Sequence, residues 1–471
     1  MKKLLILLAW LPLAANAETL TLDSCISMAL ENNKSVQSSQ LLSEKYEHEV
    51  KAYWANFFPN FKLIATDLYC TSDGYLGADL MGGVVGGVNQ FLTAMKDQLG
   101  HFTTSNATVT AYQQGAVNQF LEGMDEYKKG IDYKVGNVLQ AGILLEQPIY
   151  MGGKVMTAWQ MAKMGKQMAE QGARLSESEV IVSVQEAYAL AVRATEMQKV
   201  ALKYDSLLQS LLVDVQNAEK HGLRGHNDVL KVQVKLSEAE LQKRQAENGI
   251  RLATMNLCHY IGLPLTSQIE VDLDAFGQSP EAAPDPQASI STRPEVEVLD
   301  LKSELAAKKV KLARSEFLPQ VVLGAALSYQ KGFEVGGEDV LDGPAGGVML
   351  NVKIPLYHAN EGIHKVKSAR LEAERVRLEQ EDLVEKMNLE LAQASNNLDE
   401  AYFEVELARK SLVQSEDNLR SSNNCYNAGT ESLSDLLEAQ TLWQQAYAKL
   451  ANAKANLFVA ATKYRKASGQ L

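Results

Sequence analysis

The side chains of this sequence offer few arrangements that could carry out chemistry. Glu361 and His364 have the Glu-x-x-His spacing of two metal ligands on one helix face, but a single pair of this kind often arises by chance. No nucleophile elbow and no zinc-protease motif accompanies it. The glycine pairs at 82–83 and 86–87 lack the Lys-Ser/Thr of a phosphate-binding loop. We therefore expect no catalytic residue, no metal site and no cofactor, and predict that the protein is not an enzyme.

The four cysteines show neither a C-x-x-C pair nor metal-ligand spacing. They are Cys25, Cys70, Cys258 and Cys425. We expect unpaired packing residues, although the sequence leaves a disulfide open.

Two acidic residues, Asp228 and Asp435, lie at equivalent places in a unit that occurs twice. The same offset of 207 residues relates Pro148 to Pro355, Tyr150 to Tyr357, Gly222 to Gly429 and Asp228 to Asp435. Because long packed helices tolerate no insertions, this constant register predicts a rigid helical hairpin made twice. A carboxylate in the first turn of a helix complements the helix dipole, which is the simplest role for both residues.

The elements that position these residues are predicted to be long helices. The segment from Gly153 to His221 corresponds to a helix on the order of 100 Å at ~1.5 Å per residue. Its apolar residues recur every seven positions, a period typical of coiled-coil packing. The seams are rich in Ala and narrow, which favours a wall of helices over a globular core. The expected buried columns are Val180, Ala187, Ala194, Ala201, Leu208 and Val215, then Met387, Ala394, Ala401 and Ala408, then Ala439, Ala446, Ala453, Ala460 and Ala467.

Each hairpin is expected to reverse at a short turn, at residues 221–227 and 426–432. Both turns contain a glycine suited to the left-handed conformation just beyond a helix end. Asn227 in the first turn, and Ser432 or Ser434 in the second, could cap the next helix.

Alternating residues replace the helical period between Pro59 and Pro148 and between Pro319 and Pro355. Segments of about 9–11 residues with one apolar face are typical of transmembrane β-barrel strands, whereas soluble half-buried hairpins are the alternative. The expected strands are residues 61–69, 135–146, 321–330 and 347–354. Aromatic residues gather at one end of them, like an interfacial girdle. These are Phe57, Phe58, Phe61, Tyr150, Phe317 and Tyr357.

Four strands are too few for a closed barrel, which needs roughly eight. An open strand edge in lipid would leave backbone groups unpaired. If the strands lie in a membrane, several copies must share one barrel, of eight strands in a dimer or twelve in a trimer. Residues 71–132, between the first two strands, are expected to form a large surface-exposed loop.

The N-terminus has the pattern of a signal peptide. Lys2 and Lys3 precede an apolar run, and Ala15-Asn16-Ala17 is a cleavage site, which assigns residues 1–17 to the signal. No later segment has the roughly 20 apolar residues of a membrane helix. The formal net charge of −12 disfavours nucleic acid as a partner. The mature chain divides into a first repeat at 18–262, a linker at 263–293 and a second repeat at 294–471.

The mature start, Thr19-Leu20-Thr21-Leu22-Asp23-Ser24-Cys25, runs into Ala29-Leu30-Glu31-Asn32-Asn33 and resembles the opening of TolC-like outer-membrane efflux proteins. Further matches are Thr292-Arg293-Pro294-Glu295, Phe57-Phe58-Pro59, Phe317-Leu318-Pro319, and Tyr426 with Gly429 and Asp435-Leu436-Leu437. The resemblance covers essentially the whole mature chain. Three features depart from the family pattern. Lys34 stands where a Pro is usual, Cys25 stands where Ala is common, and the 71–132 segment is unusually long.

The resemblance implies a mainly α-helical chain with a membrane β segment. Three copies would form a 12-stranded β-barrel in the outer membrane of a Gram-negative bacterium, continuous with a periplasmic α-helical barrel. Such channels are exit ducts of tripartite efflux or type I secretion systems. The implied partners are a periplasmic adaptor (membrane fusion) protein, an inner-membrane pump of RND, ABC or MFS type, and outer-membrane lipid. The transported substrate stays open, because a duct transmits what its pump selects.

The resemblance also implies a gate at the periplasmic tip. The matching acidic positions are Asp435 and Glu438, which would form stacked carboxylate rings in a trimer, with Asp228 equivalent to Asp435 in the first copy. Tyr426 matches the tyrosine of the gate-locking hydrogen bonds, and Glu431 falls where a basic residue can occur. The adaptor is expected to contact the tip turns at Gly222, Leu223, Gly429 and Thr430. A non-pore periplasmic coiled-coil scaffold is the alternative function, which the lipid-facing strands disfavour.

Overall fold

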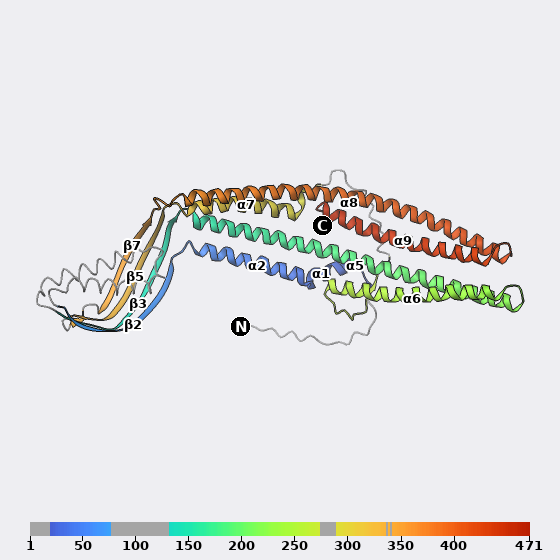
Figure 1. The fold of residues 1–471 in the computed structure, drawn as a ribbon, viewed down its shortest axis with the longest axis horizontal. Coiled ribbons are helices and arrows are strands. Elements are labelled where there is room, and N and C mark those ends of the chain that lie inside the picture. Colours follow the sequence, from blue (N-terminus) through green and yellow to red (C-terminus); the bar gives the residue numbers. More distant parts are fainter. Residues whose placement is uncertain (1–18, 77–130, 274–288, 336–337, 340–341) are drawn as a thin grey trace. The chain divides into compact units, whose positions relative to one another are not determined.

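The computed structural model describes residues 19–76, 131–273, 289–335, 338–339 and 342–471, which form two compact units (Figure 1). Of the described residues, the helical unit comprises 19–44, 167–273, 289–301 and 378–471, and the sheet unit comprises 45–76, 131–166, 302–335, 338–339 and 342–377. Each unit therefore takes segments from both halves of the chain. The predicted signal peptide lies outside the described residues.

Two helical hairpins repeat at the predicted offset. Helices α5 (Lys154–Lys220) and α8 (Glu361–Asn427) have 67 residues each, so each is about 100 Å long. They are followed by α6 (His226–Ile261) and α9 (Leu433–Ala467). The shorter helices are α1 (Leu22–Asn32), α2 (Lys34–Ala55), α7 (Pro294–Ser315) and the 3₁₀ helix η4 (Ile290–Thr292). None of the described helices has a stretch long and apolar enough to cross a membrane.

The predicted apolar columns form the core of the helical unit. Val180, Ala187, Ala201, Leu208 and Val215 are at most 6% exposed, whereas Ala194 is half-buried. The columns of α8 and α9 are at most 9% exposed apart from the half-buried Ala460. The Tyr188 hydroxyl lies 3.1 Å from two carbonyl oxygens, those of Leu20 and Asp272. It therefore fixes α5 to the short parallel ladder of β1 (Thr19–Leu20) and β4 (Glu270–Val271), which was not predicted from the sequence.

The sheet unit contains one antiparallel sheet with the order β2-β3-β5-β7. Its strands are β2 (Asn60–Leu76), β3 (Ile131–Met151), β5 (Gln320–Val335) and β7 (Gly343–Lys353), and the two-residue β6 (Glu338–Asp339) pairs with the end of β5. Among the described residues, β2 and β7 each pair on one side only.

One face of this sheet is apolar and exposed. The register aligns Leu63 with Ile143 and Ile143 with Leu327, and these side chains are 79%, 50% and 61% exposed. Val348 and Leu350 of β7 lie on the same face and are similarly exposed. Water does not normally cover such a continuous apolar surface, so this face fits lipid.

The opposite face of the sheet is polar. Lys62 and Glu146 form an ion pair there at 2.8 Å. Gln140 lies opposite Thr66 on one side and Gln330 on the other. An apolar face backed by a polar one matches the alternation of a barrel wall between lipid and an aqueous interior.

The strands differ from the prediction in length. We expected 9–11 residues, whereas β2 and β3 have 17 and 21 residues. The expected loop at 71–132 was wrong at its two ends, because residues 71–76 and 131–132 belong to these strands, and residues 77–130 lie outside the described ones. Strand pairing is decided by backbone hydrogen bonds, so it continues where the alternation of side chains has ended.

Helices and strands meet at one end of the sheet (Figure 1). The register places Met151 of β3 opposite Gln320 of β5, and Gln320 opposite Lys353 of β7. Two T-shaped ring pairs pack there. The Phe57 ring, in the connection from α2 to β2, lies 6.1 Å from the Trp159 ring of α5. The Phe317 ring, before β5, lies 4.6 Å from the His358 ring, after β7. The predicted aromatic girdle thus lies at this end of the sheet, and Phe57 and Phe317 take part in ring packing.

Candidate functional site

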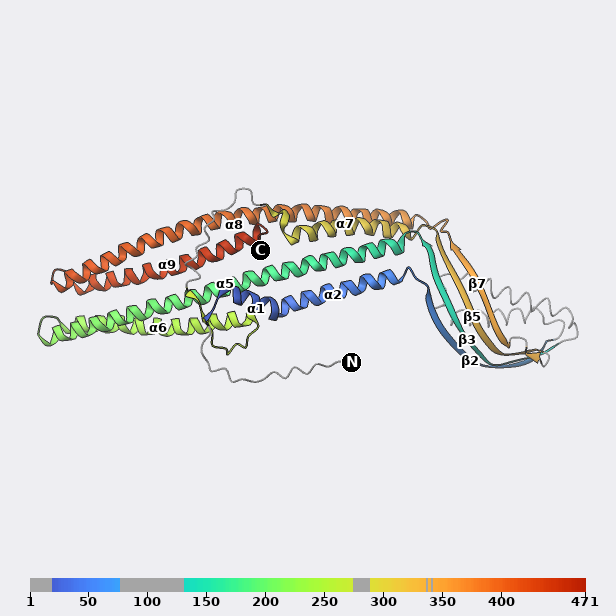
Figure 2. The same cartoon turned by 180° about the vertical axis from the view of Figure 1, so that it is seen from behind.

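The two hairpin turns have the same backbone design. In the first, the Leu223 N–H donates to the Ala218 carbonyl and Gly222 has φ 71°. In the second, the Thr430 N–H donates to the Cys425 carbonyl and Gly429 has φ 77°. Both are six-to-one helix endings that require a residue in the left-handed region, which explains the glycine in each turn. Both views show the turns side by side at the same end of the hairpins (Figure 2).

The helices that leave the turns begin differently. Ser432 caps α9 in a capping box, because its Oγ accepts from the Asp435 N–H and its own N–H donates to the Asp435 carboxylate. These hydrogen bonds hold the pKa of Asp435 below its usual range. The prediction that Asn227 caps α6 was wrong: α6 begins at His226, and its N-cap is Gly225, without a side-chain hydrogen bond.

A cation–π contact links the two turns. The Arg224 guanidinium lies 4.7 Å from the centroid of the Tyr426 ring. Burial raises the pKa of the Tyr426 hydroxyl above its usual value; Arg224 opposes the rise, and the carboxylates of Asp228 and Asp214 add to it. Tyr426 therefore lies among one basic and two acidic side chains at the tip.

Asp228 is tied to the second hairpin through a lysine. Lys231 lies 3.4 Å from the Asp228 carboxylate and donates to the Ser434 hydroxyl at 3.5 Å. Asp228 and Tyr426 thus lie at the same pair of turns, with Arg224 against the Tyr426 ring and Lys231 against the Asp228 carboxylate. Asp435 instead bonds to its own helix start, and Glu438 is exposed one turn further along α9.

An apolar cluster lies beneath these polar contacts. It joins Leu211 and Val215 of α5, Val229 of α6, and Leu433 and Leu436 of α9, all at most 6% exposed. The tip turns are thus a packed unit of both hairpins. Leu223, at the apex of the first turn, is 75% exposed.

Sequence reasoning missed Arg224 and Lys231. The offset of 207 residues aligns Arg224 with Glu431, the position where, by the resemblance, a basic residue can occur. The basic side chain is therefore supplied by the other copy of the hairpin. Comparing the charges at aligned positions of both turns could have identified it.

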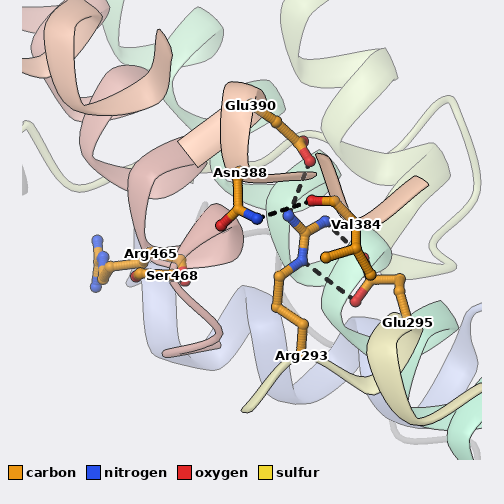
Figure 3. Close-up of polar contacts among 7 residues, drawn as sticks. All are labelled: Arg293, Glu295, Val384, Asn388, Glu390, Arg465 and Ser468. Atoms are coloured by element: carbon orange, nitrogen blue, oxygen red, sulfur yellow. Dashed lines mark hydrogen bonds and ion pairs between the residues drawn. The ribbon is translucent and has the colours of Figure 1, made fainter. Parts of the chain in front are cut away.

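A second polar cluster surrounds Arg293, in the Thr292-Arg293-Pro294-Glu295 segment (Figure 3). The Arg293 guanidinium, 5% exposed, donates to Glu295 at 2.9 Å and to Glu390 of α8 at 2.8 Å. Burial alone would raise the pKa of Glu295, but the hydrogen bonds from Arg293 outweigh it and lower that pKa. Pro294 begins α7, a position that needs no N–H. This cluster joins the start of α7 to α8 and is structural.

The Glu-x-x-His pair lies in the first turn of α8. Glu361 forms an ion pair with Lys365 at 2.7 Å, and the backbone N–H of His364 donates to the Asn360 carbonyl at the start of the helix. In the part of the chain that the structure describes, no group of three His, Cys, Asp or Glu side chains could hold a metal ion.

Comparisons with known proteins agree with this architecture. Residues 286–470 match the family model of the outer membrane efflux proteins. The chain is 20% identical over 345 residues to the outer membrane protein TolC of Vibrio cholerae serotype O1, covering 71% of this chain and 77% of that protein.

Solved structures share the fold along nearly the whole chain. The CmeC outer membrane channel of Campylobacter jejuni has a TM-score of 0.74 at 16% identity, covering 95% of this chain and 85% of that one. The MtrE outer membrane channel of Neisseria gonorrhoeae, in its open state, has a TM-score of 0.68 at 16% identity, covering 95% of this chain and 88% of that one.

Proposed function

The chain belongs to the TolC-like outer membrane efflux proteins, and we propose that three copies of it form one exit duct of a tripartite export system. It is a non-enzymatic outer-membrane channel that extends into the periplasm. A periplasmic adaptor and an inner-membrane pump of RND, ABC or MFS type would deliver the substrate.

The two-faced sheet with its open edges carries this proposal. The apolar face fits lipid, and the polar face fits water. Each strand is antiparallel to its neighbour in the order β2-β3-β5-β7, so the two edge strands β2 and β7 run in opposite directions. Strand β7 of one copy can therefore pair antiparallel with β2 of the next copy. Three copies supply twelve strands and leave no edge in lipid.

The test is reconstitution of the full-length protein, extracted from outer membranes, into planar bilayers, together with its mass in detergent. We expect a three-chain particle and stepwise ion conductance, because the shared barrel encloses a polar interior. A single-chain particle without conductance would favour the non-pore scaffold instead.

We place the gate at the tip turns, as a further part of this proposal. Tyr426 and Asp228 lie in the contact between the turns, together with Arg224 and Lys231. Breaking this contact would let the second hairpin move from the first. Asp435 and Glu438 would contribute negative charge at the entrance, where three copies bring carboxylates together.

Arg224→Gln tests the gate. We expect the resting conductance to rise several-fold, because a cation–π contact contributes ~0.5–2 kcal/mol to the closed arrangement. Arg244→Gln is the matched control, since Arg244 is 83% exposed on α6 and pairs only with the nearby Glu247 within the described chain. Equal conductance of wild type and Arg224→Gln would remove the turn contact from the gate.

The carboxylates are tested separately. Asp435→Asn keeps an oxygen that can accept from Ser432 and removes only the charge, and Glu438→Gln does the same at an exposed position. We expect the double variant to conduct anions more readily at rest. Unchanged ion selectivity would exclude the acidic rings.

The adaptor contact is proposed at Gly222, Leu223, Gly429 and Thr430. Leu223 is the exposed apolar side chain at the apex, and buried apolar anchors dominate most interfaces. Leu223→Ser should therefore abolish export in cells and leave the conductance of the purified channel unchanged.

A further inference from the structure

Positive charge is concentrated in the helical part of the sheet unit. The whole chain has a formal net charge of −12. Residues 154–166 contain three lysines and no acidic residue, residues 302–316 contain five basic and two acidic residues, and residues 361–377 contain five basic and three acidic residues. An acidic protein thus has a basic belt in the unit that contains its sheet.

The three basic segments adjoin the same end of the sheet. Lys154 is the first residue of α5 and follows β3 after a short connection. Arg314 lies next to the last residue of α7, shortly before β5, and Lys367 lies in the second turn of α8, after β7. At ~1.5 Å per helical residue, all three lie within about 10 Å along their helices of the helix ends that face the sheet.

Several of these side chains are free to bind a ligand. Lys154, Lys311, Arg314 and Lys367 are exposed, and none of them forms an ion pair with another described residue. Lys365 differs, because it pairs with Glu361 and Glu316. Unpaired basic side chains on three neighbouring helix ends make a surface for anions.

Exposed apolar side chains lie between these lysines and the apolar sheet face. Leu356 and Tyr357, in the connection from β7 to α8, are 92% and 87% exposed. Trp54 near the end of α2, Phe58 in the connection to β2 and Tyr150 near the end of β3 are about half exposed. Aromatic side chains of this kind favour the level of lipid headgroups.

We propose that this basic belt binds the anionic headgroups of phospholipids in the leaflet that faces the periplasm. The order along the sheet unit is apolar face, aromatic residues and then lysines, which matches the order hydrocarbon, interface and phosphate in a bilayer. The lysine charge would hold the channel at a fixed depth and favour anionic lipid around it. The inference rests on the proposed function, because it takes the apolar sheet face to lie in lipid.

The test measures lipid selectivity of the full-length protein in phosphatidylcholine vesicles containing 30 mol% phosphatidylglycerol. Spin-labelled phosphatidylglycerol and phosphatidylcholine report their relative association with the protein surface. We expect the wild type to prefer phosphatidylglycerol, less so at 500 mM NaCl than at 50 mM, because salt screens exposed charge. Lys154→Gln, Lys311→Gln and Lys367→Gln together should lower the preference at least about three-fold.

The matched control is Lys34→Gln, Lys410→Gln and Lys449→Gln, three exposed lysines of the helical unit with the same change in net charge. It should keep the wild-type preference. An equal loss in this control, or no loss in the belt variant, would overturn the inference. The inference would also be overturned if inorganic phosphate displaced more labelled lipid than chloride does at equal ionic strength. The belt would then be a site for free phosphate.

Single-channel conductance in neutral bilayers keeps this result apart from the proposed function. A conducting belt variant with wild-type lipid preference refutes only the lipid contact. A wild-type protein that does not conduct refutes the duct itself.

Discussion

At the level of single residues, the two copies of the repeat keep the same backbone conformation at positions where their side chains differ. Gly152 and Gly153, between β3 and α5, have φ of 61° and 82°. Their equivalents 207 residues later are Ala359 and Asn360, with φ of 48° and 66°. The same left-handed turn thus occurs twice, and non-glycine residues adopt it at a cost on the second occasion.

These positions predict different effects on stability. A Cβ at Gly152 would lie 2.6 Å from the Ser315 carbonyl oxygen, whereas a Cβ at Gly153 would have open space. Gly152→Ala should therefore lower the free energy of unfolding by about 2 kcal/mol or more, and Gly153→Ala by ~1 kcal/mol. Ala359→Gly should be neutral or stabilising by up to about 1 kcal/mol. Denaturant titration in detergent measures all three, and an equal cost for the two glycine variants would contradict the close approach of Gly152 to Ser315.

At the scale of elements, one buried hydrogen bond fixes the register of α9 on α5. The Thr462 hydroxyl, fully buried, donates to the Gln185 side chain at 2.6 Å. Many of the other buried residues of α9 are Ala, whose small side chains would fit several registers almost equally well. A polar pair can be satisfied in one register only, because any shift leaves a buried group unpaired.

Thr462→Val should therefore destabilise the protein by about 1–3 kcal/mol, since it leaves the Gln185 oxygen buried and unpaired. Adding Gln185→Leu should recover part of the loss. Thr441→Val on the same helix is the control, because the Thr441 hydroxyl bonds only to the Leu437 carbonyl of its own helix among the described residues. If the control is as costly as Thr462→Val, the pair does not specify the register.

At the level of the whole molecule, hydrogen bonds from Thr292 and Arg293, just before α7, join the start of the second repeat to α8 and to the end of α9. Arg293 connects the start of α7 to α8, and the Thr292 hydroxyl donates to the Ser468 carbonyl just beyond α9. The helical unit therefore joins elements from both ends of the second repeat. Removing one partner of such a buried pair leaves an uncompensated charge.

This cluster predicts a pH dependence. The pKa of Glu295 is lower in the folded state than in the unfolded chain. Its contribution to stability is therefore fully present above the unfolded pKa and is lost as the pH falls through the folded pKa. Glu295→Gln should lower Tm at pH 7 and flatten the decrease of Tm between about pH 5 and pH 3. Glu297→Gln, an exposed residue of the same helix turn, should change neither. A wild-type pH profile in Glu295→Gln would remove this pair from acid stability.

The long helices, the paired hairpins, the strands and the family could all be predicted from the amino-acid sequence. Heptad columns, alternating strands and glycine turns depend on spacing along the chain, and spacing is what a sequence records. Spacing also predicted that Tyr426 and Asp228 lie at the hairpin turns.

Which side chains contact one another could be learned only from the fold. It assigned Asp435 to the cap of its own helix, because Ser432 lies three residues away, and it placed Arg224 from one copy against Tyr426 from the other. It also extended the strands beyond their alternating pattern and built each unit from both halves of the chain. Contacts between residues some 200 positions apart depend on how the elements pack, and no local pattern in the sequence records that.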